Sequence, residues 1–516
     1  MARMRDTPPA CKESPAYLCG EELRALPRAL WGDTPAMRLA GPAYLPLHEG
    51  ETSDSRDYVR RLESSFLYPA HPRAVRNLVG KIFARPVALG KDVPEQIEEW
   101  CEDVDLRGNN LHNFARCVET DVWLDGVGFI LVDYASTDGS AFSRADDAAA
   151  GRRPWLVRYR AAELINWRTE YVAGRHRLTV AVFREVATTP AGDFGEATVT
   201  RCRAYRRTPE GVTYELWEQV GDEDWQNTEP RHLLIMGGAP AAEIPVVAIY
   251  ADPDEAGRYG AACPPLTGLA WLNVRDWQKQ SDLDNIEHTA NVPVTVWPGM
   301  ASDEVKALPW GPTVAIGTPV DCKPAYLEHS GKAIGELKAS IAQNRELMRL
   351  LSLEPLVPKS GTQTATGEAI RGAEAHSQLL AAALCLQDGL EQALRLMAQW
   401  ARLGDDAGGS VIVNTKFQLT QADAADVQAL NQMRMDREIT RETRWKEMQR
   451  REVLGDDFDP DLEAEALEKE AANDLAGAGR AEALARRAIE LVKSGEDPDA
   501  ALAQAEAEVH GDAAAA

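Results

Sequence analysis

Residues 366–403, TGEAIRGAEAHSQLLAAALCLQDGLEQALRLMAQWARL, form the longest helical pattern in the chain. The apolar side chains that recur every three or four positions, as one face of a helix requires, are Leu379, Ala383, Leu386, Leu390, Leu394, Met397 and Trp400. Thr366 is a suitable N-cap, Glu368 suits the positive end of the helix dipole, and Gly404 ends the pattern. At about 1.5 Å per residue the helix is more than about 50 Å long, so we expect a strut that spans a core.

Two further helices and an insertion precede this strut. Residues 264–289 begin with two prolines, which fit the first helical turn, and change from apolar to polar halfway along. Residues 331–351 carry another apolar stripe at helical spacing. Between these helices, residues 292–329 hold six prolines and two β-like pieces, 294–297 and 313–316. We therefore expect a helix, a small compact insertion and a second helix.

Residues 353–366 (LEPLVPKSGTQTAT) connect the second of these helices to the strut. The stretch is polar, rich in threonine and without a helical pattern. A loop of this length inside a compact domain is usually functional. We expect it to project from the rigid frame of the two helices.

The first 263 residues mix both kinds of element. Residues 1–40 are rich in proline and are expected to be irregular. Helical patterns start near residues 53, 72 and 110, and the run Phe129–Val132 is typical of a buried strand. Residues 155–250 contain several strand-like pieces separated by turns, so this part predicts an α+β domain.

The chain after the strut is expected to return to one strand and then to become helical. Residues 410–419 (SVIVNTKFQL) predict a strand, and residues 421–454 predict a pair of helices. In residues 461–516, 19 of 56 residues are alanine and the charge is 5 − 14 = −9. Alanine favours helix strongly, but few large apolar side chains are present to pack this tail.

The composition limits the possible functions. The 516 residues carry a net charge of 56 − 81 = −25, which argues against a surface that binds phosphates generally. The first 20 residues lack the apolar core of a secretory signal, and no apolar run is long enough to span a bilayer. The eight cysteines are scattered without a C-x-x-C pair, as expected of reduced thiols in an intracellular protein.

Motifs that carry catalysis are missing. There is no phosphate-binding G-x-x-x-x-G-K-[ST] loop, no H-E-x-x-H and no G-x-S-x-G, and the nine histidines occur singly. The acid pairs Asp103/Asp105 and Asp282/Asp284 are explained better by solvated loops or helix faces than by a metal site. We therefore expect a structural protein that is not an enzyme, with no cofactor and no metal.

The order of several local sequences resembles a portal-like family of tailed bacteriophages that has been catalogued as an uncharacterised domain. The resemblance extends from about Tyr44 to Asp461 and rests on the order and spacing of its pieces. They are residues 44–46 (YLP) with 48–51 (HEGE), 78–83 (LVGKIF) with 85–86 (RP), 126–133 (GVGFILVD), 165–168 (INWR), 264–266 (PPL) with 272–273 (LN), and 366–369 (TGEA).

The resemblance implies an α+β portal fold. An irregular arm (1–40) would precede an α/β wing (41–263), and two stem helices (264–291 and 330–352) would flank a small β-containing clip (292–329). A tunnel loop (353–366), a long wing helix with a returning strand (367–420), and a helical crown with an Ala- and acid-rich tail (421–516) would follow.

The resemblance also implies a function and partners. Portal proteins form a homo-oligomeric ring, usually of twelve copies, at one capsid vertex, and double-stranded DNA enters and leaves through it. The implied partners are the terminase large subunit, the head–tail adaptor, the major capsid protein and the scaffold. The implied location is the portal vertex of the virion, with host cytoplasm as the site of assembly.

Candidate residues follow from this comparison. The tunnel loop would place Lys359, Ser360, Gly361, Thr362, Gln363 and Thr364 at the DNA channel. Trp297, Pro298, Trp310 and Pro312 would contact the motor and the adaptor from the clip. Trp271, Trp277 or both would lie at subunit contacts, because large aromatic side chains on a partly polar helix often anchor interfaces.

Two other classes of function stay open. Another head–tail connector or capsid protein would also lack catalytic motifs, although connectors are usually shorter and without long helices joined by a loop. A nuclease using Glu102, Asp103 and Asp105 would show metal-dependent DNA cleavage, which we do not expect.

Overall fold

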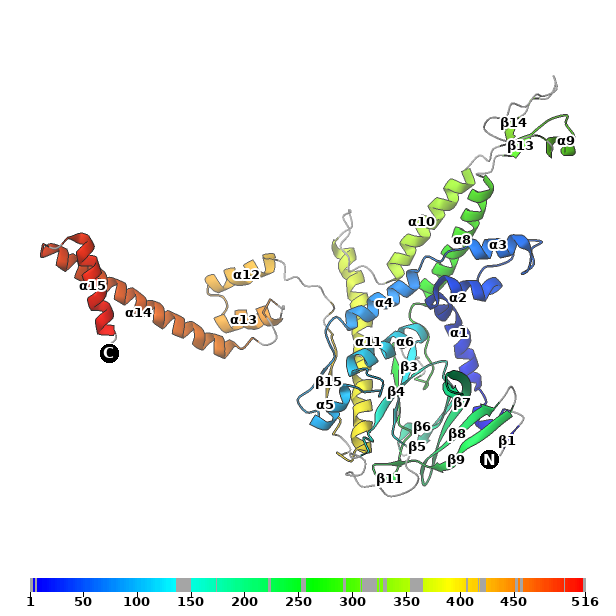
Figure 1. Ribbon diagram of the computed structural model, residues 1–516, viewed down its shortest axis with the longest axis horizontal. Coiled ribbons are helices and arrows are strands. Elements are labelled where there is room, and N and C mark those ends of the chain that lie inside the picture. Colours follow the sequence, from blue (N-terminus) through cyan, green and yellow to red (C-terminus); the bar gives the residue numbers. More distant parts are fainter. Residues whose placement is uncertain are drawn as a thin grey trace. The chain divides into compact units, whose positions relative to one another are not determined.

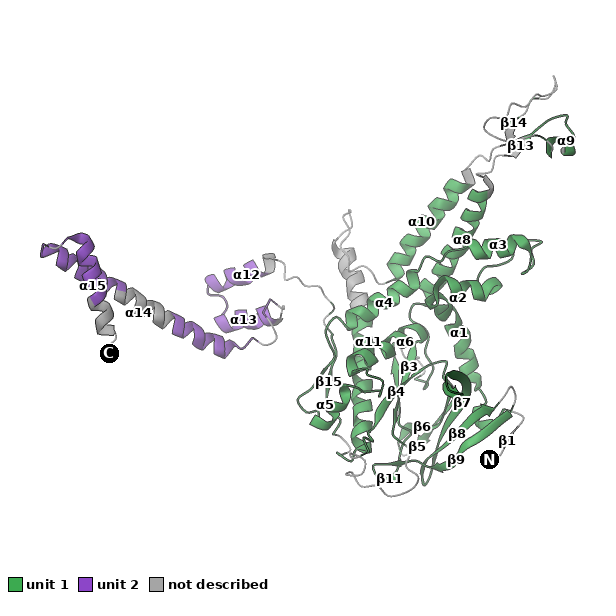
Figure 2. Cartoon of the chain, viewed as in Figure 1, with its two compact units in different colours: residues 1–417 green, residues 418–516 purple. Residues whose placement is uncertain are grey.

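The computed structural model describes the chain apart from residues 1–2, 5–6, 136–149, 173, 221–223, 252–256, 291–293, 307, 309–322, 324, 328–331, 353–364, 405–406, 416, 418–423, 451–452, 455–457, 496 and 514–516. The chain divides into two compact units, residues 1–417 and residues 418–516 (Figure 2). The first unit contains both helices and strands, which confirms the expected α+β class (Figure 1).

A six-stranded antiparallel sheet occupies one part of the first unit, with the spatial order β1-β9-β8-β7-β6-β5. Its strands are β1 (Arg3–Met4), β5 (Leu164–Val172), β6 (Arg175–Ala191), β7 (Gly195–Thr208), β8 (Gly211–Val220) and β9 (Asp224–Leu233). Successive side chains alternate between two apolar clusters: Ala181 and Phe183 pack in one and Val182 in the other. Both faces of the sheet are therefore covered at its middle, while the ends of β6 and β7 nearest their shared turn are exposed.

A three-stranded antiparallel sheet lies at the centre of the first unit, in the order β12-β3-β4. Its strands are β3 (Val127–Asp133), β4 (Trp155–Arg160) and β12 (Val246–Tyr250). The first six residues of β3 are buried, which confirms the strand expected at Phe129–Val132. Gly126 turns the chain from the preceding helix into β3 with a φ of 84°, a conformation that glycine adopts without strain.

The long helix α11 (Ala365–Trp400) packs on this central sheet and forms the main core, as the strut prediction required. The stripe residues Leu379, Leu386, Leu390 and Leu394 are completely buried. Gly389 lets α11 approach β12 closely, because a Cβ there would lie 2.6 Å from Cγ1 of Ile249. The other helices of this core are α4 (Ala70–Ile82), α5 (Glu95–Cys101) and α6 (Leu111–Asp125).

The N-terminal segment differs from the sequence prediction. Residues 15–40 are not irregular but form helices α1 (Pro15–Trp31) and α2 (Asp33–Ala40). The Ser14 side chain caps α1 by accepting a hydrogen bond from the Tyr17 amide at 3.1 Å, and Pro15 occupies the first turn, where it is tolerated. The prolines therefore mark the start of a helix rather than a segment without structure.

Short elements complete the first unit. They are the turns η1 (Pro9–Cys11) and η2 (Gly41–Ala43), helix α3 (Arg56–Ser64), and strands β2 (Ala88–Leu89), β10 (Ile235–Met236), β11 (Ala239–Pro240) and β15 (Val411–Ile412). Of the strand expected over residues 410–419, the described residues show β15, which pairs with the equally short β2. Val413 and Phe417, which follow β15, also pack in the core.

The second unit is helical where it is described, as expected for residues 421–516. Its helices are α12 (Ala424–Met435), α13 (Arg441–Arg450), α14 (Pro460–Lys493) and α15 (Pro498–Ala513). Trp445 of α13 packs edge to face against Phe458, with ring centroids 5.6 Å apart. Leu491 shares a small buried cluster with Ala501 and Ala505 of α15. Alanine at this contact allows the two helices to approach closely.

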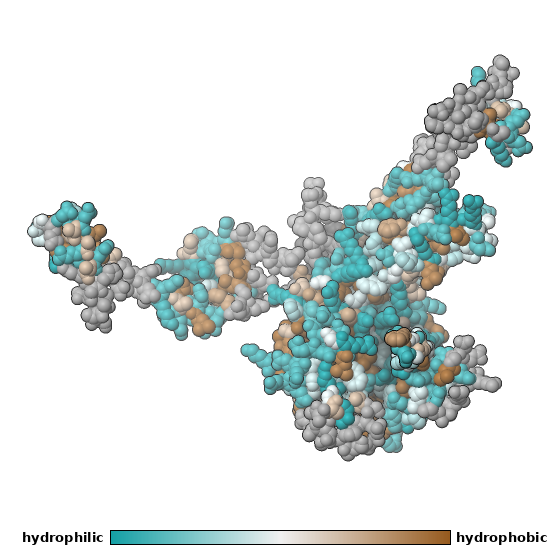
Figure 3. Space-filling model, viewed as in Figure 1, coloured by the Kyte–Doolittle hydropathy of each residue, from teal (hydrophilic) through white to brown (hydrophobic). Residues whose placement is uncertain are grey.

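None of the described helices is long and apolar enough to cross a membrane. On the face shown in Figure 3, apolar residues are interspersed with hydrophilic ones.

Candidate assembly surface

The helices α8 (Thr267–Ala290) and α10 (Lys332–Leu351) form an antiparallel hairpin that extends from the core of the first unit (Figure 1). Its base is fixed by Asn273 of α8, which is completely buried. The Asn273 Oδ1 accepts a hydrogen bond from the His71 amide at 2.9 Å, and its Nδ2 donates to the Tyr68 carbonyl at 2.8 Å. A buried amide with both ends bonded holds the helix in one position.

Residues 48–51 (HEGE) make a second contact with α8, farther along the helix. The Glu51 carboxylate accepts a hydrogen bond from the His48 amide at 2.8 Å and pairs with Arg61 at 2.8 Å. The His48 ring lies 3.5 Å from the Asp282 carboxylate of α8. This sequence, on which the resemblance partly rests, therefore supports the hairpin from the side.

Polar contacts join the two helices of the hairpin. The Asn344 amide donates to the Leu272 carbonyl at 3.0 Å, and the Lys279 ammonium donates to the Ser340 hydroxyl at 2.7 Å. The Arg345 guanidinium pairs with the buried Asp276 carboxylate at 3.2 Å. A buried carboxylate is costly without a partner, so this pair fixes the register of α10 on α8.

An open cleft of about 520 Å³ lies on this hairpin. Leu283 and Ile341 form its buried floor, while Lys338, Arg345 and Arg349 supply positive charge at its walls. These cations already have acidic partners, in Glu287, Asp276 and Glu346 respectively. Among the described residues that line the cleft, every cation therefore has an acidic partner and none is left for an anionic ligand.

The insertion between the two helices contains a small antiparallel pair of strands, of which the sequence predicted the first, at 294–297, and missed the second. Strand β13 (Val294–Val296) pairs with β14 (Ala325–Leu327), and the short helix α9 (Ser302–Lys306) lies between them in the sequence. Of the expected clip contacts, Trp297 is half-buried and Pro298 is exposed. Trp310, Pro312 and the β-like piece 313–316 lie outside the described residues.

The two tryptophans expected at subunit contacts have different environments. Trp277 is 0% exposed and packs against Leu30, Met37 and Tyr58 of its own chain. Trp277 has no exposed surface for another subunit, so the prediction that it lies at a subunit contact is wrong. The polar composition of the second half of α8 does not prevent this side chain from packing against neighbouring helices of its own chain. Trp271 is 59% exposed, which leaves it available to a partner.

Trp271 belongs to an exposed apolar patch that was not recognised from the sequence. Leu347, Leu350 and Leu351 of α10 are each between 43% and 47% exposed. Leu351 lies beside Gly268, and Trp271 follows one turn later on α8, so these side chains share one flank of the hairpin. We call Trp271, Leu347, Leu350 and Leu351 the hairpin patch. Exposed clusters of this kind often mark protein contacts.

The expected tunnel loop lies outside the described residues, including Lys359, Ser360, Gly361, Thr362, Gln363 and Thr364. The helices on either side of it are described: α10 ends at Leu351 and α11 begins at Ala365.

Asp103 and Asp105, which a nuclease could use to hold a metal ion, have another role in this chain. The Asp105 carboxylate accepts hydrogen bonds from the amides of Arg107 and Asn109, at 3.0 and 3.3 Å. The Asp103 carboxylate accepts one from the Gly108 amide at 2.7 Å. These carboxylates stabilise a turn. No group of acidic, histidine or cysteine side chains in the described part of the chain could hold a metal ion.

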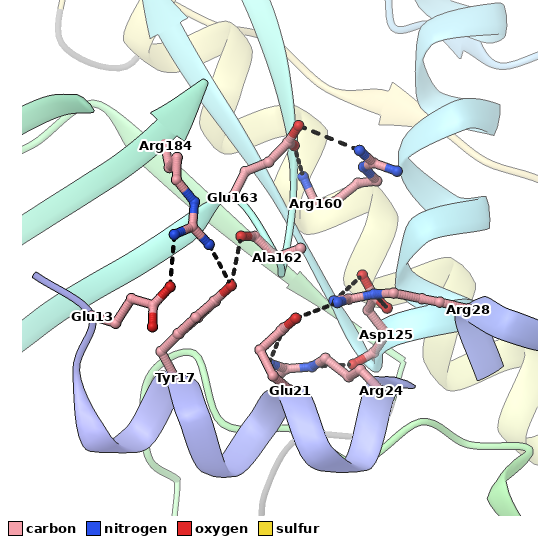
Figure 4. Close-up of polar contacts among 10 residues, drawn as sticks. All are labelled: Glu13, Tyr17, Glu21, Arg24, Arg28, Asp125, Arg160, Ala162, Glu163 and Arg184. Carbon is pink, nitrogen blue, oxygen red and sulfur yellow. Dashed lines mark hydrogen bonds and ion pairs between the residues drawn. The ribbon is translucent and has the colours of Figure 1, made fainter. Parts of the chain in front are cut away.

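Three acidic side chains of α6 are buried: Glu119, Asp121 and Asp125. Glu119 is completely buried and accepts a hydrogen bond from the Trp123 indole at 2.8 Å, and burial raises its pKa to about 8. Asp125, at the end of α6, accepts two hydrogen bonds from Arg28 of α1, at 2.7 and 3.0 Å (Figure 4). Arg24, also buried, donates to the Asp125 carbonyl. These contacts attach α1 to the core.

Comparisons with known proteins give one family match and several structural matches. A family model described as a domain of unknown function (DUF4055) matches residues 265–401, which include α8, the insertion, α10 and α11. This match confirms the resemblance to an uncharacterised domain for that part of the chain. A search of curated proteins finds no match.

The solved structures that match come from gene transfer agent particles. A chain from the neck of an empty particle, computed with C6 symmetry, is 12% identical with a TM-score of 0.38, covering 76% of this chain and 92% of that chain. A chain from the native virion is 12% identical with a TM-score of 0.36 and the same coverage. One from the native neck, computed with C12 symmetry, is 12% identical with a TM-score of 0.36, covering 70% and 84%. TM-scores this low do not establish a common fold, so the function proposed below is drawn from this chain's own residues.

Proposed function

We propose that this chain is a structural, portal-like protein whose copies form a ring at one vertex of a phage capsid. Double-stranded DNA passes through the ring during packaging and ejection. The observation that carries the proposal is the α8–α10 hairpin, which is anchored in the core, bears a β-containing insertion and exposes an apolar patch. The sequence resemblance assigns the same segments to the stem and the clip of a portal.

The hairpin has the features that a ring contact needs. Asn273 anchors α8 to the core and the Asp276–Arg345 pair joins α10 to α8, so a neighbouring copy would meet a preformed surface. Trp271 at the hairpin patch supplies a large aromatic anchor, the kind of residue that dominates binding energy at interfaces. We propose the hairpin patch as one side of the contact between copies.

The charge of the chain fits a passage for DNA rather than a binding site for it. Twelve copies would carry 12 × −25 = −300 charges. A wall of like charge gives the phosphates few places to bind, although screening limits the effect to about 8 Å. The proposed tunnel loop would add Lys359 as one weak phosphate contact per copy, with neutral polar neighbours at 360–364.

The insertion is proposed as the clip. It would bind the terminase large subunit during packaging and the head–tail adaptor afterwards, through Trp297, Pro298, Trp310 and Pro312. The rest of the first unit would contact the major capsid protein and the scaffold. The ring would assemble in the host cytoplasm and remain at the portal vertex of the virion.

Self-association is the first test. We expect the purified chain to form rings with a central hole as wide as duplex DNA in two-dimensional image averages. Trp271→Ala should shift the assembly toward monomers in light scattering at the same concentration. Phe194→Ala is the matched control, because Phe194 is a fully exposed aromatic residue at the β6–β7 turn, away from the hairpin. A parent chain that stays monomeric at all concentrations would refute ring formation.

The clip is tested by deleting residues 298–324. The deletion removes most of the insertion but retains β13 and β14, so we expect soluble protein that still forms rings and no longer binds the motor. Normal packaging by this variant would remove the clip assignment.

The tunnel loop is tested by replacing residues 360–364 with a shorter glycine linker. We expect rings to form and heads to retain less full-length DNA than the parent. Packaging and retention equal to those of the parent would make the loop a simple connector.

A further inference from the structure

The N-terminal residues 8–17 cross one face of the six-stranded sheet. We call this segment the strap. The Ser14 amide donates to the Ile165 carbonyl at 2.9 Å, and the Asn166 side chain donates to the Lys12 carbonyl, also at 2.9 Å. The strap is thus attached to β5, the edge strand of the sheet, through the main-chain groups of Lys12 and Ser14, which follow η1.

Charged and phenolic side chains attach the strap to the next strand. Arg184 of β6 pairs with the Glu13 carboxylate at 2.6 Å and donates to the Tyr17 hydroxyl at 2.9 Å (Figure 4). The Tyr17 hydroxyl in turn donates to the Ala162 carbonyl at 3.2 Å. Arg184 therefore holds the strap through two of its side chains, Glu13 and Tyr17.

Two cysteines that are far apart in the sequence meet where the strap packs on the sheet: Cys11 lies in the strap, and Cys202 lies on the strand beneath it. Cys11 belongs to η1 and is 5% exposed, and Cys202 belongs to β7 and is 1% exposed. Both pack in one apolar cluster with Tyr17, Ile165 and Trp225. The two thiols are within hydrogen-bonding reach of each other, and this contact together with burial raises the pKa of Cys11. All described cysteines, these two included, are free thiols.

We propose that Cys11 and Cys202 are a redox modification site: an external disulfide such as oxidised glutathione converts them into a disulfide that fixes the strap to β7. No other described pair of cysteines shares a core cluster with both thiols buried. The proposal is independent of ring formation, so its failure would leave the proposed function untouched.

The reaction is an exchange of thiols and disulfides. The Cys11 thiolate would attack the external disulfide and release one thiol, giving a mixed disulfide on Cys11. The Cys202 thiolate would then attack the Cys11 sulfur and release the second thiol. Two protein thiols are oxidised, one external disulfide is reduced to two thiols, and the two thiol protons leave with the products.

Burial sets the rate of this reaction. A thiol reacts as its thiolate, and near-complete burial of Cys11 and Cys202 keeps an oxidant as large as glutathione disulfide from both sulfurs while the strap is closed. Oxidation must therefore follow opening of the strap. Once closed by a disulfide, the strap can no longer leave the sheet, and the bond joins residues that are 202 − 11 = 191 positions apart. Closing so long a loop restricts the unfolded chain strongly.

The test uses the full-length chain, reduced and then incubated with oxidised glutathione. Remaining thiols are alkylated, and the protein is digested without reduction and mapped by mass spectrometry. We expect a peptide containing Cys11 linked to a peptide containing Cys202, while the exposed Cys19 and Cys117 carry glutathione. Cys11 and Cys202 recovered as free thiols, or each carrying glutathione, would overturn the proposal.

Two variants test the role of the strap. Arg184→Ala removes its ion pair and one hydrogen bond, so the linked peptide should form several times faster than in the parent. Arg207→Ala is the matched control, because Arg207 binds a backbone carbonyl, that of Ala242, and has no contact with the strap among the described bonds. Linkage at the same rate in both variants would show that opening of the strap does not limit oxidation, which contradicts the proposed mechanism.

Thermal unfolding supplies a readout without variants: oxidation should raise the melting temperature by at least a few degrees, and a reductant should reverse the shift.

Discussion

Trp277 and Trp271 lie on the same helix, six positions apart, and the structure gives them opposite roles. Trp277→Ala removes a completely buried indole from the cluster that joins α8 to α1 and α2. An indole buries about 200 Å² and each Å² contributes about 25 cal/mol, so the upper estimate is about 5 kcal/mol, and measured replacements of buried aromatics by alanine cost about 3–5 kcal/mol. We expect a loss in this range from the free energy of unfolding of the first unit.

No hydrogen bond adds to this loss. The Trp277 indole nitrogen has no partner among the described residues, so the variant loses packing alone. Trp277→Phe keeps most of the volume and should cost clearly less, about 1–2 kcal/mol. Trp271→Ala should change the free energy of unfolding by about 0.5 kcal/mol or less, because Trp271 is mostly exposed.

The assay is urea unfolding followed by tryptophan fluorescence and circular dichroism, at protein concentrations where the chain is monomeric. Only the transition of the first unit is compared, since the two units need not unfold together. A Trp277→Ala variant as stable as the parent, or one that stays folded and only fails to assemble, would refute the assignment of Trp277 to the core.

Three further predictions concern buried groups. Because the pKa of Glu119 is raised, the folded chain binds more protons than the unfolded chain between pH 4.5 and about 8. This group therefore lowers the free energy of unfolding as pH rises through that range, by at most about 1.4 kcal/mol per pH unit. Glu119→Gln should remove this contribution. Gly389→Ala should cost about 1–3 kcal/mol by forcing α11 away from β12, whereas Gly80→Ala, on an exposed face of α4 with open space around it, should be neutral or stabilising. Arg345→Ala should cost about 2 kcal/mol by leaving the buried Asp276 without its cation, a figure reduced because Arg345 is partly exposed.

Each of these predictions has a measurement that can contradict it. Unfolding midpoints of the parent and Glu119→Gln that change in parallel between pH 5 and pH 8 would show that Glu119 does not titrate as stated. Equal melting temperatures for the two glycine variants would contradict the close approach of α11 to β12. Arg349→Ala is the control for Arg345→Ala, because its pair with Glu346 is exposed, and equal losses in both would contradict the burial argument.

The sequence predicted the elements whose signals are local. The stripe from Leu379 to Trp400 fixed the long helix, since a helical period sustained over many turns has one good solution. The paired prolines predicted that a helix begins near them, and the apolar run at 129–132 predicted the buried strand β3. The β-like piece at 294–297 correctly predicted a strand in the insertion.

Contacts between distant residues were decided only by the tertiary structure. Proline content predicted an irregular N-terminus, but the cap at Ser14 and burial of Leu30 and Met37 made it helical, because packing outweighs local propensity. The two tryptophans of α8 were alike in the sequence, and only the position of α1 and α2 made Trp277 part of the core while Trp271 stayed exposed. The hairpin patch likewise needed α10 to be aligned on α8, and no periodicity in one helix specifies that alignment.

The cysteine pair shows the same limit most clearly. Spacing along the chain gave no reason to connect Cys11 with Cys202, and the sequence therefore indicated isolated thiols. The meander of the six-stranded sheet places Cys202 on the face that the strap covers, and the contacts of Glu13, Ser14 and Tyr17 bring Cys11 onto it. A sequence pattern determines which face of its own strand or helix a residue occupies, whereas its neighbour across the core depends on how all the elements pack together.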